Sequence, residues 1–414
     1  MQSSDSSGLT NPSRTVVPKK EIREGRLLLL LATIQFTHII DFVIMMPLGP
    51  QLMRVFGISP QQFGFIVSAY TFSAAVSGFI STLFLDKFDR KNALLLLYIG
   101  FILGTFCCAI ATGYEILLLA RIIAGAFGGV IGALVFAIIG DAIPEERRGA
   151  ATGKVMAAYS AASIAGVPAG LYLATTLNWH APFYALTFLS LMVLATTYFA
   201  LPAMRGHLTN AVTFNPLRVL SDILRNTNLL LALGLMIALT LAGFTIIPFI
   251  SPFLVSNIGF ADNELGYMYL FSGISTLIVS PLVGRLADRY GKQRVFTIVA
   301  FLSIIPILLL THLKPAPHWL VLIVTTAFFV GFGARFVPAV ALITSSAAPN
   351  IRGSFMSFNS SIQQLATGSA AILSGFIIQE TTAGPLLYFN IVGFIASAAT
   401  LLAIIIIRKL KVVS

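Results

Sequence analysis

Twelve long apolar runs, separated by short polar segments, dominate the pattern of the chain. A run of about twenty apolar residues makes a helix long enough to cross the hydrocarbon core of a bilayer. A polar stretch at about 202–227 divides the runs six and six. We therefore predict an all-α membrane protein with two six-helix bundles. The runs occupy about residues 27–53, 63–85, 92–112, 114–142, 150–174 and 182–201, then 228–255, 264–286, 295–313, 319–346, 354–379 and 385–407.

The polar segments give the expected domain limits. We predict a disordered tail at 1–26, because this stretch is rich in serine, proline and basic residues. The first bundle then covers 27–201, the connector 202–227, the second bundle 228–407 and a short tail 408–414. The first apolar run is too long for a secretory signal and no small-residue cleavage site ends it, so we expect it to remain as a membrane helix.

The composition indicates a protein embedded in lipid, and the motifs that the chain lacks argue against an enzyme. Of 414 residues, 57% are hydrophobic and 10% charged, and the mean hydropathy is +0.91. Cys107 and Cys108 are adjacent within an apolar run, so they supply neither a disulfide framework nor metal-ligand spacing. The chain contains no complete phosphate-binding loop and no zinc-hydrolase or serine-hydrolase motif. We therefore expect no enzymatic activity, no cofactor and no metal.

The basic residues predict the orientation. If the N-terminus is cytoplasmic, 22 of the 26 basic residues fall in inner segments. Arg54 and Lys314 lie in outer loops, and Arg121 and Arg335 lie within apolar runs. Such a bias places both termini and the connector in the cytoplasm. The net charge of +11 is then a consequence of topology, and we do not expect nucleic-acid binding.

Residues recur between the two halves of the chain. The first half repeats in the second at an offset of 202, which is the sign of an internal duplication. The matching pairs are Phe42 and Phe244, Ile44 and Ile246, Pro50 and Pro252, Gly57 and Gly259, Gly64 and Gly266, and Ser73 and Ser275.

A charged loop also recurs at this offset. Residues 284–292 read Gly-Arg-Leu-Ala-Asp-Arg-Tyr-Gly-Lys, and residues 86–91 form a weaker copy. This pattern resembles the signature loop of the major facilitator superfamily, although Thr82 and Asp89 stand where that family usually has glycine. The resemblance implies a monomeric secondary transporter of a bacterial inner membrane, with two bundles that alternate access to a midplane site.

The resemblance also implies a gate at the cytoplasmic side. Acidic residues of the loops would meet helix N-termini of the opposite half, whose free N–H groups favour an anion. Arg90 would pair with Asp141. The alternative is that these loops carry ordinary topological charge. The residues assigned to the gate are Asp86, Arg90, Asp141, Asp288 and Arg289.

The fifth run contains Gly166-Val-Pro168-Ala-Gly170. It resembles a variant of the antiporter motif of drug:proton antiporters, and with the following Trp179 it is similar to the bacterial sugar-efflux and arabinose-efflux-like branch. The resemblance implies export of a small molecule in exchange for protons. The alternative reading of the small residues is close helix packing alone.

Asymmetry between the halves picks out three charged residues. Asp41 aligns with a glycine at the offset of 202. In the later runs the offset drifts to about 204, and there Arg335 aligns with an isoleucine and Arg121, which begins an Arg-x-x-x-Gly pattern, with a threonine. An ionisable residue inside a membrane helix is costly and is a candidate functional group. We predict that Asp41 carries the proton and that Arg335, at a similar depth, tunes it. The alternatives are a structural ion pair for Asp41 and a snorkelling side chain for Arg121.

Uncharged polar residues within the runs are candidates for the substrate cavity. They lie in the first and eleventh runs, where hydrogen bonding between helices is the alternative role. We predict a proton-coupled antiporter that exports a drug-like or sugar-like molecule. A proton symporter or uniporter of the same fold, and a transporter-like receptor or sensor, are the competing hypotheses. The cavity candidates are Gln35, His38, Asn359, Gln363 and Gln364.

Overall fold

The structure is a computed structural model that describes residues 24–81, 85–205, 221, 223–348, 351–381 and 384–413. The predicted tail up to residue 23 and most of the connector lie outside these residues. The described chain is almost entirely helical, and one short antiparallel hairpin pairs β1 (Gln379–Glu380) with β2 (Leu386–Leu387).

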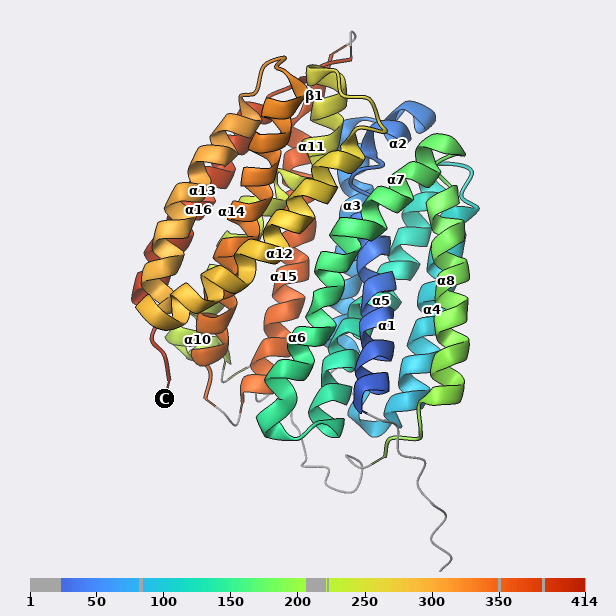
Figure 1. The fold of residues 1–414 in the computed structure, drawn as a ribbon, viewed down its shortest axis with the longest axis vertical. Coiled ribbons are helices and arrows are strands. Elements are labelled where there is room, and N and C mark those ends of the chain that lie inside the picture. Colours follow the sequence, from blue (N-terminus) through green and yellow to red (C-terminus); the bar gives the residue numbers. More distant parts are fainter. Residues whose placement is uncertain are drawn as a thin grey trace, which may run out of the picture.

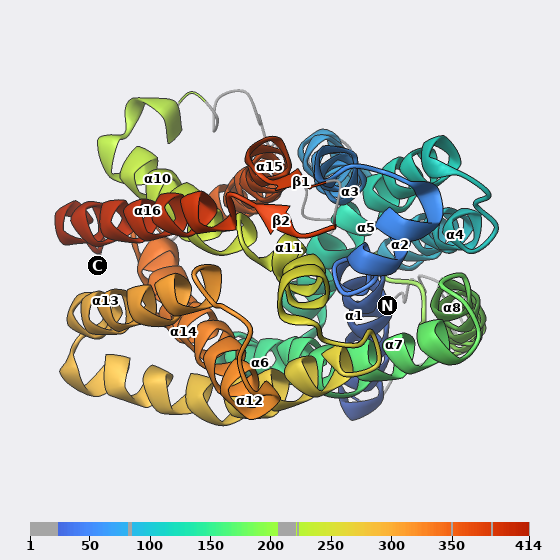
Figure 2. The same cartoon turned by 90° about the horizontal axis from the view of Figure 1, so that it is seen from above.

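Two helical bundles stand side by side, with α1 to α8 in one and α10 to α16 in the other (Figure 1 and Figure 2). The first contains α1 (Glu24–Val43), α2 (Gly49–Phe56), α3 (Pro60–Ser81), η1 (Leu85–Lys87), α4 (Arg90–Ala109), α5 (Tyr114–Ala142), α6 (Glu145–Ala161), η2 (Ala162–Gly166), α7 (Val167–Thr176) and α8 (Ala181–Ala200). The second contains α10 (Thr227–Phe244), α11 (Ile247–Phe253), η4 (Leu254–Ile258), α12 (Leu265–Tyr290), α13 (Lys292–Thr311), α14 (His318–Ser345), α15 (Arg352–Ile377) and α16 (Phe389–Lys409).

Each of the twelve predicted runs corresponds to one helical unit, and three units are interrupted: the first after α1, the fifth at η2 and the seventh at α11 and η4. Eleven units are long and apolar enough to cross a membrane. The remaining one is α15, which is 26 residues long but carries many serine, asparagine and glutamine residues. Its polarity marks it as a helix that faces other protein or water rather than lipid alone.

A proline explains the interruption of the fifth unit. Pro168 has no N–H to donate, and its ring clashes with the carbonyl four residues earlier in a regular α-helix. The preceding residues, Ala162–Gly166, form a π-helical turn, which widens the backbone just before the proline. The α6–η2–α7 unit therefore bends at the antiporter-like motif.

The predicted duplication is visible in the backbone. Gly57 and Gly259 both end a helix in the left-handed conformation, with φ of 60° and 85°. A methyl group built on Gly64 of α3 would contact the backbone of Ala371 in α15. One built on Gly266 of α12 would approach Pro168 in α7. Equivalent glycines thus face the opposite bundle at equivalent places.

The apolar core shows which end of the molecule is closed. We call the end that holds the start of α1 and the end of α16 the basic end, and the other the far end (Figure 1). One apolar cluster at the far end joins both bundles, with Leu48 and Phe63 on one side and Phe249 and Leu254 on the other. The clusters nearer the basic end each belong to a single bundle. The structure is therefore closed at the far end.

Candidate functional site

A buried ion pair lies at the far-end terminus of α1. Asp41 and Arg121 are both inaccessible to solvent, and Arg121 Nη1 donates to Asp41 Oδ2 at 2.8 Å. Thr105 of α4 donates its hydroxyl to Asp41 Oδ1 at 3.0 Å. The Asp41 carbonyl, in the last turn of α1 where carbonyls lack helical donors, accepts from Arg121 Nη1 at 3.1 Å. These contacts offset part of the cost of burying two charges.

Tyr70 of α3 completes the environment of Arg121. The Arg121 Cζ atom lies 4.4 Å from the centre of the Tyr70 ring, a cation–π contact. The glycines of the Arg-x-x-x-Gly pattern make the space. A methyl group on Gly125 would lie 2.2 Å from the Tyr70 carbonyl, and one on Gly128 would lie 2.3 Å from the Tyr70 hydroxyl. The pattern therefore presses α5 onto α3 beside the ion pair.

Two polar residues of α1 continue from the ion pair toward the basic end. Gln35 and His38 are buried, and His38 lies beside the rings of Tyr70 and Phe101, at 6.3 and 6.1 Å between ring centres. Neither ring nitrogen of His38, nor Gln35 Oε1, has a hydrogen-bond partner among the described residues. Unsatisfied buried polar atoms of this kind favour contact with water or a ligand.

A row of four aromatic rings crosses from one bundle to the other. Tyr70 lies 5.3 Å from Phe42, Phe42 lies 6.3 Å from Phe244, and Phe244 lies 5.9 Å from Phe332, all between ring centres. We call these residues the aromatic row. Phe42 and Phe244 are the pair matched by the sequence repeat, so the row crosses the boundary between the bundles at equivalent positions.

Arg335 does not approach Asp41. It is buried in the second bundle, where Nη1 donates to the hydroxyls of Thr400 at 2.8 Å and Ser303 at 3.4 Å. Its Cζ atom lies 5.4 Å from the centre of the Phe332 ring. The predicted partnership of Asp41 with Arg335 is therefore not present in this structure, in which Arg121 of the same bundle holds the carboxylate.

Packing gives the physical reason. The position equivalent to Asp41 in the second bundle is Gly243, and the Phe332 ring fills its place, 2.0 Å from where a Cβ would stand. The aromatic row thus separates the two arginines, and Arg335 turns instead to hydroxyls on α13 and α16. Its role in tuning the carboxylate stays a prediction.

The antiporter-like motif packs directly on the helix that carries Asp41. Methyl groups on Gly166 and Gly170 would lie 2.3 and 2.6 Å from the side chains of Ile40 and Ile44. On its other side, the η2 turn meets Gly273 of α12 in the second bundle. The bent α6–η2–α7 unit therefore contacts both the neighbour of the carboxylate and the opposite bundle.

The cavity candidates of the eleventh run lie on α15. Asn359 is buried, and its Oδ1 has no partner among the described residues. Gln363 and Gln364 are half-buried. Because α15 packs on α3, these residues lie on a helix at the boundary between the bundles.

The gating residues are only partly assembled. Arg90 Nε donates to Asp141 Oδ2 at 2.9 Å, which confirms the predicted contact, although both residues belong to the first bundle. The side chain of Asp86 lies outside the described part of the structure. Asp288 is exposed and forms no hydrogen bond or ion pair with the described residues, and Arg289 lies over the neighbouring tyrosine ring. The predicted gate would hold the basic end closed. In this structure the bundles are joined at the far end instead, so the gate contacts between the bundles are not formed in the described part of the chain.

Asp89, a departure from the family glycine, caps α4. Its carboxylate accepts the N–H groups of Lys91 and Asn92 at 2.9 and 3.4 Å, and Arg205 Nε at 3.0 Å. Burial alone would raise the pKa of Asp89, but these hydrogen bonds outweigh it and hold the pKa below the usual value. Asp89 therefore stays ionised near neutral pH and ties the start of the connector to α4.

An ion pair joins the bundles at the far end. Arg54 of α2 pairs with Asp262, in the segment between η4 and α12. Both side chains are partly exposed, so the pair contributes at most about 1 kcal/mol. It nevertheless crosses the boundary at the end that is closed here.

We expect Arg54→Glu to open the far end, because it places two acids in contact. The ratio of closed to open molecules should fall by about five-fold, the effect of roughly 1 kcal/mol. Electron-spin distances between labels at Val55→Cys and Asn263→Cys would measure it. The charge swap of Arg54→Asp with Asp262→Arg is the control and should restore closure. An unchanged distance distribution in Arg54→Glu would show that the pair does not hold this end.

Sequence reasoning missed Tyr70 and Thr105. The comparison of halves that found Asp41 would have found them too. Tyr70 aligns with Ser272 and Thr105 with Ile307 at the offset of 202, so neither residue is repeated in the second half. Both residues are uncharged, whereas the asymmetry between the halves picked out charged residues.

Comparison with known proteins defines the family. The Major Facilitator Superfamily matches residues 31–246 and 232–413. The Bacillus subtilis MFS-type transporter YceJ is 26% identical over 85% of this chain and 89% of its own. The chloramphenicol resistance protein of Streptomyces lividans is 25% identical over 81% of this chain and 84% of its own. The probable sugar efflux transporter of Helicobacter acinonychis is 23% identical over 85% of this chain and 87% of its own. A D-xylose-proton symporter structure covers 92% of this chain and 97% of its own, with a TM-score of 0.76 at 15% identity. With both bundles matched, the chain belongs to the major facilitator superfamily and is a multi-pass membrane transporter.

Proposed function

We propose that this protein is a proton-coupled antiporter that exports a small neutral organic molecule. The observation that carries the proposal is the sealed Asp41–Arg121 pair with its Thr105 hydrogen bond. A carboxylate in this position can take up one proton, and doing so removes half of a buried ion pair. Losing one partner of a buried ion pair costs about 3–5 kcal/mol.

The pair links protonation to the arrangement of the bundles. While Asp41 is ionised, Arg121 holds it and the far end of α1 is pinned to α4 and α5. Protonation weakens that attraction and leaves Arg121 with the Asp41 carbonyl and the Tyr70 ring. Since the antiporter-like motif packs Gly166 on the neighbouring Ile40, a shift of α1 is transmitted to the unit that faces α12.

Proton and substrate would then exclude one another. If substrate binds best to the state with Asp41 ionised, substrate binding must release the proton and proton binding must release the substrate. That reciprocity is what exchange requires. Arg335 is permanently charged in the second bundle. It would add a constant positive electrostatic potential to the protonation equilibrium of Asp41.

The residues at the boundary between the bundles favour a neutral molecule with a flat apolar face and some hydrogen-bonding groups. The aromatic row offers ring faces, and His38 and Thr240 supply buried polar atoms without partners among the described residues. The carboxylate of Asp41 is already neutralised, so it does not select a cation. The names of the relatives, one a chloramphenicol resistance protein and one a probable sugar efflux transporter, support a drug-like or sugar-like substrate for this chain.

We also infer that the basic end faces the cytoplasm, because the loops and termini there carry most of the basic residues. A membrane-impermeant thiol reagent applied to intact cells should label Pro315→Cys at the far end. It should leave Ser6→Cys and Ser414→Cys unlabelled until the membrane is permeabilised, with the wild-type protein as background. Labelling at either terminus in intact cells would reverse the orientation.

Transport by purified protein in vesicles tests the function. A panel of neutral drugs and sugars is offered with a pH gradient imposed in either direction. Antiport predicts that the substrate accumulates on the side from which protons flow. Accumulation with the proton flow would identify a symporter, and equilibration without a response to the gradient would identify a uniporter; either result would overturn the proposal.

A further inference from the structure

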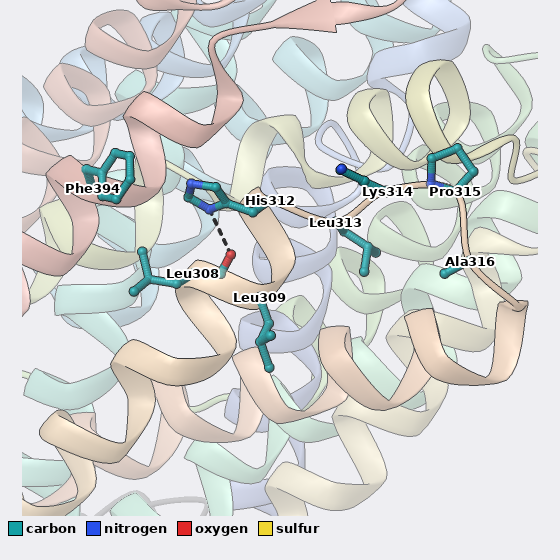
Figure 3. Close-up of a pocket in the computed structure, with 8 residues that line it drawn as sticks. All are labelled: Leu308, Leu309, His312, Leu313, Lys314, Pro315, Ala316 and Phe394. Carbon is teal, nitrogen blue, oxygen red and sulfur yellow. Dashed lines mark hydrogen bonds between the residues drawn. The ribbon is translucent and has the colours of Figure 1, made fainter.

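A groove opens on the outer surface of the second bundle at the far end, where α13 ends and α16 begins (Figure 3). It encloses about 570 Å³. Its floor is apolar and includes Leu308, Leu309 and Phe394, of which Leu309 and Phe394 are more than half exposed. Its rim carries two basic side chains, His312 and Lys314. The groove lies far from the Asp41–Arg121 pair, in the other bundle.

Lys314 is an exception to the concentration of basic residues at the basic end. Only two basic residues fall in far-end loops, and the other, Arg54, is paired with Asp262. Lys314 is exposed and has no carboxylate partner among the described residues. A lone cation on the rim of an apolar, membrane-facing groove is complementary to a molecule that has one negative group above a hydrocarbon chain.

His312 adds a directional polar contact. Its Nδ1 lies 3.0 Å from the Leu308 carbonyl, which can only accept, so Nδ1 carries the proton and Nε2 of the neutral ring is free to accept (Figure 3). An edge-on contact with Phe394, 5.0 Å between ring centres, holds the imidazole over the groove. Nε2 therefore suits a hydroxyl donor rather than a second anionic oxygen.

Trp319 gives the depth of the groove in the membrane. It lies in the first turn of α14, just after the loop that forms the rim, and is 63% exposed. An exposed tryptophan at the end of a membrane helix is typical of the headgroup level of a bilayer. The two basic side chains are thus at the height of lipid phosphates, and the leucines below them are at the height of acyl chains.

We propose that this groove is a binding site for an anionic phospholipid with a hydroxylated headgroup, such as phosphatidylglycerol, in the leaflet at the far end. Lys314 binds the phosphate, His312 accepts a headgroup hydroxyl, and one acyl chain lies along Leu308, Leu309 and Phe394. A cation of this kind favours an anionic over a zwitterionic lipid by about five-fold.

Quenching of Trp319 fluorescence tests the proposal. Trp179→Phe leaves Trp319 as the only tryptophan of the chain. This protein is placed in vesicles that contain equal mole fractions of phosphatidylglycerol and phosphatidylcholine, with one or the other brominated on its acyl chains. We expect brominated phosphatidylglycerol to quench more strongly, with a relative binding constant of about five. Lys314→Gln should bring the two lipids to equality, and Lys314→Arg should keep the preference.

Two controls separate a specific site from general attraction. Lys292→Gln removes one positive charge at the other end of α13 and should leave the preference unchanged. Soluble glycerol phosphate should not reduce quenching, because it lacks the acyl chain. Equal quenching by both lipids in the parent protein, an unchanged preference in Lys314→Gln, loss of the preference in Lys292→Gln, or displacement by glycerol phosphate would each overturn the proposal.

Discussion

Replacing Asp41 by asparagine should abolish transport driven by a proton gradient while substrate exchange across the membrane continues. Asparagine keeps the size of the side chain but cannot ionise. Its single side-chain oxygen can still accept from Arg121, and its amide group can donate to the Thr105 hydroxyl. The conformational cycle then no longer depends on proton binding. With a pH gradient imposed, accumulation of substrate in vesicles should fall to the level seen without a gradient. The rate of exchange of labelled for unlabelled substrate should stay within a few-fold of wild type.

A matched control is Glu380→Gln, which makes the same acid-to-amide change at an exposed position of β1. It should transport like wild type. If Asp41→Asn still concentrated substrate when driven by protons, Asp41 would be a structural partner of Arg121 and not the proton carrier.

Arg121→Met should cause a large loss of stability. It strands a buried carboxylate, and breaking a buried pair in this way costs about 3–5 kcal/mol. Thermal unfolding of the purified protein would show a large fall in midpoint, and transport should be lost. The double variant Asp41→Asn with Arg121→Met leaves no unpaired charge, so it should regain most of the stability but no proton-driven transport.

Arg335→Met is the comparison that isolates the ion pair. Arg335 is equally buried, but it donates its hydrogen bonds to the hydroxyls of Ser303 and Thr400, so its removal leaves no unpaired charge. Its effect on stability should be clearly smaller than that of Arg121→Met. Equal losses in the two variants, or no recovery in the double variant, would show that the Asp41–Arg121 interaction is not what stabilises the first bundle.

The architecture could be predicted from the sequence because membrane helices are recognised by the length and low polarity of their apolar runs. The six-and-six division and the repeat follow from apolar periodicity and from pairs such as Gly57 and Gly259, whose shared left-handed backbone only glycine adopts easily. The Arg90–Asp141 contact was also predicted, since both residues belong to a loop pattern with a known geometry in the resembling family.

The partner of Asp41 was not predictable from depth alone. The prediction treated the first run as one straight helix, which put Asp41 near the midplane at the level of Arg335. In the structure α1 ends at Val43, so Asp41 lies in its last turn, about 26 Å from Glu24. That raises it toward the far end, where Arg121 lies two turns into α5. Spacing gives distance along an axis but not the break in the helix or the direction in which a side chain points.

The aromatic row was invisible for a related reason. Its members come from α1, α3, α10 and α14, and single phenylalanines are common in any apolar run. Only the packing of the two bundles brings Phe42 and Phe244 together. The same is true of the orphan nitrogens of His38, since burial without a partner is a property of the folded protein.

Proton release on substrate binding tests the central claim most directly. Purified protein in weakly buffered detergent solution is mixed, at each of a series of pH values, with a substrate identified in the vesicle panel. A pH-sensitive dye reports the protons at the pH of greatest release. Reciprocal linkage predicts that the wild type releases about one proton per protein. Asp41→Asn should bind the substrate and release none. Equal release from Asp41→Asn and the wild type would contradict the account.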